Sequence, residues 1–271
     1  MDVNYLIQRE CLRRGLSRKT IKTYCGCVRK FFGFCHKEPR KVTKKDVRLF
    51  LDKFIEKDAP GNTINVYLNA LKFLFENILN KKLFLKIKYS KIPKSLPLVL
   101  TKEEVLKILD SIGNEKHKLM IKLMYSAGLR VSELVHLKVC DLQLDKNYGW
   151  VRKGKGRKDR MFIIAQSLKE ELLSLVSDLE YGSYLFKGRC GHITVRTVQE
   201  IIKKSVKKAG LEKKAHPHTL RHSFATHLIE NGYDLNSVQN LLGHASPETT
   251  MIYVHMASPN MINVKSPLDC L

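Results

Sequence analysis

Three short strings of the sequence combine residue types that could together cleave a phosphodiester. They are Gly128-Leu-Arg130-Val-Ser-Glu133-Leu, His218-Thr-Leu-Arg221-His-Ser-Phe, and Leu242-Gly-His244 followed by Tyr253. Cleavage needs a nucleophile, cations that neutralise the growing charge on phosphorus, and a donor that protonates the leaving sugar oxygen. A tyrosine phenol can attack phosphorus and conserve the bond energy as an ester, so rejoining needs no ATP. Each arginine can make paired hydrogen bonds to phosphate oxygens.

The order and spacing of these strings resemble the motifs of the tyrosine recombinases, also called phage-type integrases. The resemblance extends to Lys155, which lies between two glycines in a predicted hairpin where that family keeps its catalytic lysine. It implies that Tyr253 is the nucleophile, forming a 3′-phosphotyrosine, and that Lys155 protonates the leaving 5′ oxygen. It further implies that His218 assists deprotonation of the tyrosine and that His244 hydrogen-bonds the scissile phosphate.

Several of these residues also have plainer interpretations. The hairpin is so rich in cations that it could be a simple phosphate-binding turn, and Lys153 and Lys158 are alternative acids. Glu133 lies one turn after Arg130 and is expected to orient that arginine or its neighbours, although an exposed helix charge would also fit. Tyr253 taken singly could fill the core from a helix face, but its spacing from the preceding motif favours the nucleophile.

Two more histidines, His222 and His227, lie on the same predicted helix as Arg221 but outside the motif positions. We interpret them as packing or DNA-facing residues. The seven cysteines form an odd count without a paired Cys-x-x-Cys spacing, so neither a disulfide framework nor a zinc site is expected. No metal and no cofactor is therefore assigned to the site.

The resemblance also implies partners and a reaction course. It implies two rounds of strand exchange through a four-way junction, made by a homo-tetramer on two double-stranded DNA sites, with a monomer or dimer free in solution. The compact length most resembles Xer-type recombinases, which suggests chromosome dimer resolution in the cytoplasm. Alternatives are a virus or plasmid integrase, a type IB topoisomerase, and a basic DNA-binding protein without turnover. Whether Tyr253 acts in cis stays open, as does the placement of the C-terminal tail.

The charge of the chain supports a nucleic-acid partner. Lysine and arginine total 49 against 26 aspartate and glutamate, a formal net charge of +23. Residues 1–100 carry 23 basic and 8 acidic side chains, and residues 101–271 carry 26 and 18. Such charge on two globular segments favours DNA, because phosphate contacts release counterions. We expect no membrane contact and an intracellular protein, since no long apolar run or signal peptide is recognisable.

Four helices are predicted in residues 1–85, which the resemblance identifies as a core-binding, DNA-binding domain. Ser17 has the character of an N-cap, and Thr43 with Asp46 resembles a weaker capping box. Apolar side chains recur at helical spacing after both caps, and a further stripe begins at Ile64.

An interdomain linker is placed at residues 86–100. The helical periodicity there dissolves into lysines, with Pro93 and Pro97 interrupting any helix and favouring extended backbone. Residues 101–271 are assigned to the catalytic domain. Its sequence turns to short β segments in one stretch, which predicts a small antiparallel sheet from residues 141–144, 150–153 and 160–164.

The remaining catalytic domain is predicted to be helical. Thr101 with Glu104 forms a capping box, and Ser167 with Glu170 is predicted to cap another helix. Further helices are expected at residues 116–127, 195–209 and 218–231, and around Ser237 and Pro247. The fold class is therefore mainly α with a small antiparallel sheet. A helical core-binding domain precedes an α+β tyrosine-recombinase catalytic domain.

Overall fold

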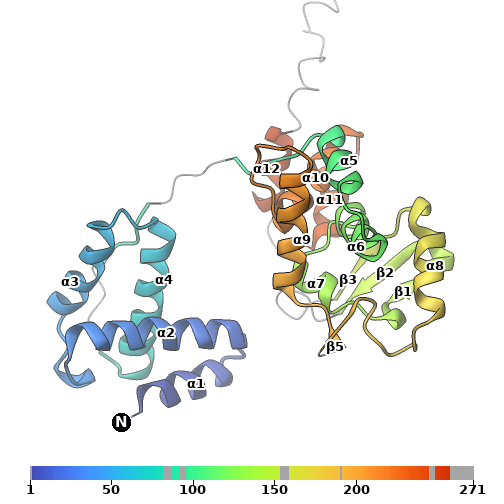
Figure 1. Cartoon of the computed structure of the whole chain (residues 1–271). Coiled ribbons are helices and arrows are strands. Elements are labelled where there is room, and N and C mark those ends of the chain that lie inside the picture. Colours follow the sequence, from blue (N-terminus) through green and yellow to red (C-terminus); the bar gives the residue numbers. More distant parts are fainter. Residues whose placement is uncertain are drawn as a thin grey trace, which may run out of the picture. The chain divides into compact units, whose positions relative to one another are not determined.

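The computed structural model describes residues 2–81, 87–91, 96–152, 159–189, 191–243 and 248–256. The chain divides into two compact units, Met1–Lys94 and Ser95–Leu271, each with a hydrophobic core of its own (Figure 1). The predicted fold class, mainly α with a small antiparallel sheet, is confirmed. The domain limits at residues 85 and 101 stay a prediction.

The described part of the first unit is helical. Phe31 lies at the centre of its core, with its ring edge-on to those of Phe50 and Phe75. Ser17 and Thr43 cap their helices as predicted, and Thr43 forms the capping box with Asp46. The helices are α1 (Val3–Arg13), α2 (Arg18–Cys35), α3 (Lys44–Ile55) and α4 (Gly61–Lys72), which continues into a π-helical turn at Phe73–Ile78.

Residues 87–91 pack with the first unit. The side chain of Asn65 accepts a hydrogen bond from the backbone N–H of Ser90 at 2.8 Å and donates one to its carbonyl at 3.0 Å. The hydroxyl of Tyr89 lies 2.8 Å from the side-chain oxygen of Asn69. This segment, which falls inside the predicted linker, is therefore fastened to α4.

The second unit combines helices with two small sheets. The helices are α5 (Lys102–Asp110), α6 (Glu115–Ser126), α7 (Val131–Val135), α8 (Lys169–Ser177), α9 (Val195–Lys208), α10 (Pro217–Glu230), α11 (Leu235–Leu242) and α12 (Glu248–Met256). Among them α10 packs against α6, α9, α11 and α12 (Figure 1). No helix in the described residues is both long and apolar enough to span a membrane.

The predicted three-stranded sheet is present. Strands β1 (Leu142–Gln143), β2 (Tyr148–Val151) and β3 (Arg160–Ile163) pair antiparallel in that order. A second hairpin, β4 (Lys187–Gly188) with β5 (Gly191–His192), has no counterpart in the sequence predictions.

The predicted cap at Ser167 is wrong. Residues Gln166–Leu168 form a 3-10 turn, and α8 begins at Lys169 without a side-chain cap. The sequence has the right residue types for a capping box, but the helical turn starts earlier and incorporates the serine. Side-chain capping is therefore replaced there by continuous backbone hydrogen bonding.

Candidate active site

Arg221 is held in the interior of the second unit by two backbone carbonyls. It lies in the middle of α10 with 3% of its surface exposed. Its Nη1 donates to the carbonyl of Gly128 at 2.6 Å, and its Nη2 donates to the carbonyl of Leu242 at 2.6 Å. Burial, followed by the nearby charge of Arg130, lowers the pKa of Arg221 to about 9, which leaves the guanidinium charged at neutral pH.

Arg130 and Glu133 form an ion pair with two hydrogen bonds at the start of α7. The backbone N–H of Arg130 donates to Glu133 Oε2 at 2.9 Å, and its Nη1 donates to Oε1 at 2.6 Å. The glutamate is buried, so it is not the exposed helix charge that the sequence left open. Its contacts fit the predicted orienting role for Arg130.

A third arginine completes this cluster from the sheet. Arg160, the first residue of β3, donates from Nη2 to Glu133 Oε2 at 2.7 Å and from Nη1 to the carbonyl of Leu241 at 2.5 Å. The same carboxylate lies 4.0 Å from Arg221. Burial alone would raise the pKa of Glu133, but the charge of Arg160 and the bonds from Arg130 outweigh it and hold that pKa below the usual value.

Two glycines adjoin this cluster in positions that leave no room for a side chain. Gly128 has φ +57°, and a Cβ there would lie 2.4 Å from the ring of Phe224. Gly243 ends α11 with φ +62°, and a Cβ there would lie 2.6 Å from Cδ of Arg160. Both positions favour glycine because of the left-handed backbone and the close contact. The glycines in the first and third motif strings therefore have a structural reason.

Tyr253 points from α12 into the interior, where only 2% of the residue is exposed. Its hydroxyl lies 2.9 Å from Nδ1 of His222 on α10. Burial raises the pKa of the phenol, and the charges of Arg221 and Arg130 act against that rise. The hydroxyl is therefore protonated at neutral pH and lies within the field of two arginines.

The structure brings together four of the seven predicted site residues: Arg130, Glu133, Arg221 and Tyr253. His218 is on the same helix, with its side chain exposed and its ring centroid 6.4 Å from that of His222. The predicted residues Lys155 and His244 lie outside the described residues, as do Lys153 and Lys158.

Sequence reasoning missed two residues of this cluster. In the sequence Arg160 is one of many cations in the hairpin, and its place at the start of an apolar strand is the feature that distinguishes it. His222 was interpreted as packing or DNA-facing. Its spacing of four residues from His218 places it on the same helix face, which was the available signal for a site position.

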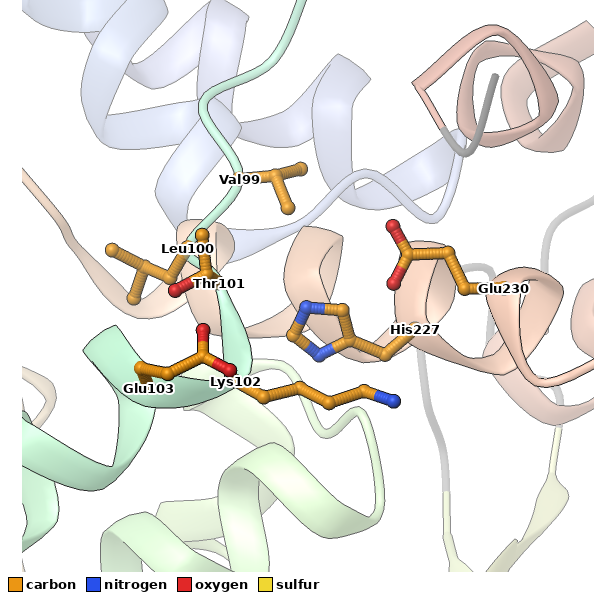
Figure 2. A pocket seen from close by; sticks show the side chains of 7 residues that line it. All are labelled: Val99, Leu100, Thr101, Lys102, Glu103, His227 and Glu230. Carbon is orange, nitrogen blue, oxygen red and sulfur yellow. The ribbon is translucent and has the colours of Figure 1, made fainter. Parts of the chain in front are cut away.

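Helix α10 also lines a separate cavity of about 420 Å³ in the second unit (Figure 2). None of the predicted site residues lines it. Its walls come from Val99, Leu100, Thr101, Lys102, Glu103, His227 and Glu230. His227 Nδ1 lies 2.7 Å from the hydroxyl of Tyr125, and its burial fits the packing interpretation.

Comparison with known families agrees with this geometry. A family described as "Phage integrase family" matches residues 98–259, and one described as "Phage integrase, N-terminal SAM-like domain" matches residues 6–84. The chain belongs to the phage integrase family of tyrosine recombinases. Its enzymatic class is DNA cleavage and rejoining by transesterification.

Several relatives of this recombinase carry Xer names. It is 39% identical to tyrosine recombinase XerA of Pyrococcus horikoshii over 254 residues, covering 91% of this chain and 86% of the relative. It is 34% identical to tyrosine recombinase XerC of Thermodesulfovibrio yellowstonii, covering 93% and 91%. The crystal structure of XerH recombinase on palindromic difH substrate, a post-cleavage complex, matches with TM-score 0.72 and 26% identity, covering 94% and 82%.

Proposed function

We propose that the recombinase cleaves and rejoins double-stranded DNA at specific sites through a covalent bond between Tyr253 and a 3′ phosphate. The observation that carries the assignment is the placement of the Tyr253 hydroxyl, held 2.9 Å from His222 on α10. Burial raises the pKa of this phenol, and the nearby charges of Arg221 and Arg130 oppose that rise. A phenol in such a field is suited to attack an anionic phosphate whose charge the same arginines neutralise.

In the cleavage step the phenolic oxygen forms a bond to phosphorus while the bond to the 5′ oxygen breaks. Arg130 and Arg221 stabilise the charge that grows on the non-bridging oxygens, and their guanidiniums are held in place by Glu133 and by the carbonyl of Gly128. The family resemblance assigns protonation of the leaving oxygen to Lys155 and a phosphate contact to His244. Attack by a 5′ hydroxyl on the phosphotyrosine reverses the step, so no cofactor or ATP is consumed.

Both units are proposed to bind the duplex, the first as core-binding domain and the second as catalytic domain. The net charge of +23 supports phosphate contacts over both. Relatives seen on DNA include XerH on difH substrate and a lambda integrase dimer on a core site. By analogy we infer a homo-tetramer that joins two DNA sites and exchanges strands through a four-way junction.

The favoured biological role is Xer-like resolution of chromosome dimers in the cytoplasm. Similarity to XerA and XerC along most of the chain supports it. A virus or plasmid integrase is the second candidate, and relatives described as "Integrase/recombinase" from Escherichia coli and Pseudomonas aeruginosa, 33% identical over 302 residues, support it. A recombination assay on chromosomal sites and on virus or plasmid sites would separate these two roles.

The proposal is tested by mixing the full chain with sheared genomic DNA of the source organism, without added metal or ATP, and resolving covalent adducts on an SDS gel. We expect an adduct with the wild-type chain and none with Tyr253→Phe. Sequencing the attached DNA then gives the cleavage site. Equal adducts from both proteins would contradict the assignment of Tyr253.

A further inference from the structure

The side chain of His222 forms a hydrogen bond with the hydroxyl of Tyr253. The two atoms, Nδ1 and Oη, are 2.9 Å apart, and the ring centroids are 5.6 Å apart. The contact joins the middle of α10 to α12, and it places the imidazole next in sequence to Arg221. An imidazole in this position touches the atom that would attack phosphorus.

The surroundings of His222 keep its ring neutral. Burial lowers its pKa to about 4, and the nearby His218, His216 and Arg221 act in the same direction. Tyr253 faces it from α12 with a phenol whose pKa is raised by burial. At neutral pH the pair therefore consists of a neutral phenol and a neutral imidazole. A neutral imidazole has one nitrogen that donates and one that accepts.

We propose that Nδ1 of His222 is the acceptor in this pair and takes the hydroxyl proton of Tyr253 during DNA cleavage. As the phenolic oxygen bonds to phosphorus, its O–H bond breaks and the proton passes to Nδ1, giving an imidazolium. The 5′ oxygen leaves with a proton from the general acid. In rejoining, the tyrosine oxygen leaves phosphorus and recovers its proton from the imidazolium. This inference rests on the proposed nucleophilic role of Tyr253.

The bound DNA would favour this transfer. The scissile phosphate brings negative charge to Arg221 and Arg130, which offsets the cations that disfavour an imidazolium in the free protein. His218 lies one turn earlier on α10 with an exposed side chain, and its ring centroid is 6.4 Å from that of His222.

The first test measures covalent adduct formation on an oligonucleotide carrying the mapped cleavage site, for the wild-type chain and for His222→Asn. Asparagine can place a hydrogen-bonding oxygen near the position of Nδ1 but cannot take the proton. We expect the variant to cleave about 100-fold more slowly, within the usual range for a proton-transfer group. His117→Asn, on α6 and outside the site, is the matched control and should cleave normally.

The pH profile separates proton transfer from simple positioning. The wild-type rate should be flat between pH 6 and 8, because His222 is already neutral there. The rate of His222→Asn should rise about tenfold per pH unit, since the phenol must then ionise by itself. A variant within about threefold of wild type, with the same flat profile, would overturn the role of His222 alone. Failure of the wild-type chain to form any adduct would instead overturn the proposed function and this role with it.

A second test needs no DNA. In the full chain labelled with ¹⁵N-histidine, the His222 resonances are assigned by their loss in His222→Asn. At pH 7 we expect the ¹⁵N chemical shift of Nδ1 to be that of an unprotonated, hydrogen-bonded nitrogen. In Tyr253→Phe this chemical shift should move toward the value of an unprotonated nitrogen without a hydrogen bond. A protonated Nδ1 would mean that the imidazole donates to the tyrosine oxygen, which would overturn the proposal.

Discussion

The two units differ in what they bury. The described part of the first unit buries no charged side chain, and its core is aliphatic and aromatic around Phe31. The second unit buries Glu133 and Arg221 and partly buries Arg130 and Arg160 beside them. Burying charge costs free energy that pairing only partly offsets, so such a cluster is weak as a stabilising device. The comparison indicates that the charged cluster of the second unit, which lies beside that unit's own apolar core, is kept for chemistry and not for stability.

The largest effect on stability is expected in the first unit. Phe31→Ala empties the centre of the aromatic core and should lower the free energy of unfolding of that unit by about 3–5 kcal/mol. Trp150, the one tryptophan of the chain, lies in β2 of the second unit and reports on that unit by fluorescence. During urea unfolding, far-UV circular dichroism should show that the first unit of the variant unfolds at a lower urea concentration than that of the wild type. The unfolding midpoint reported by Trp150 fluorescence should stay unchanged. A joint shift of both signals would contradict the separation of the two interiors.

The next effect probes the buried charges of the second unit. Glu133→Gln keeps the shape but leaves Arg130 and Arg160 without their carboxylate, which should cost about 3 kcal/mol at neutral pH, seen as a lower Trp150 midpoint in urea. The matched control is Glu200→Gln, which breaks an exposed pair with Arg196 on α9 and should cost less than about 0.5 kcal/mol. Equal effects of the two substitutions would show that burial adds nothing to the Glu133 cluster.

The same variant gives a pH dependence. The folded-state pKa of Glu133 lies below its usual value of 4.5, so the carboxylate stabilises the fold above that pH. As the pH falls through the lower folded value the carboxylate is protonated, and the difference between wild type and Glu133→Gln should vanish. A difference that stays constant from pH 7 down to pH 3 would contradict the ionised state of Glu133.

The smallest effect returns to the first unit. Thr43→Ala removes one N-cap hydrogen bond and its capping box with Asp46, which should lower the stability of that unit by about 1 kcal/mol. Circular dichroism in urea should detect the change, and Trp150 fluorescence should not. A change in the Trp150 midpoint would show that the two units share stability.

The same contrast explains what could be predicted from the sequence. Helices with side-chain caps and apolar stripes, such as the one after Thr43, depend on local spacing and were predicted well. Catalytic motifs also contain residues that are close in sequence, so the contact between Arg130 and Glu133, three residues apart, could be predicted. The contacts of Arg160 and His222 join residues 27 and 31 positions away, so local spacing could mark these two positions but could not name their partners. The cap at Ser167 failed because a 3-10 turn replaced it.

The central claim is that the second unit's buried cluster serves a tyrosine that bonds covalently to DNA. It is tested most directly by isolating the adduct, digesting the DNA with nuclease and the protein with protease, and locating the attached nucleotide by mass spectrometry. We expect the nucleotide on Tyr253, joined through a 3′ phosphate, with a free 5′ hydroxyl on the other strand end. Attachment to another residue, or through a 5′ phosphate, would contradict the claim.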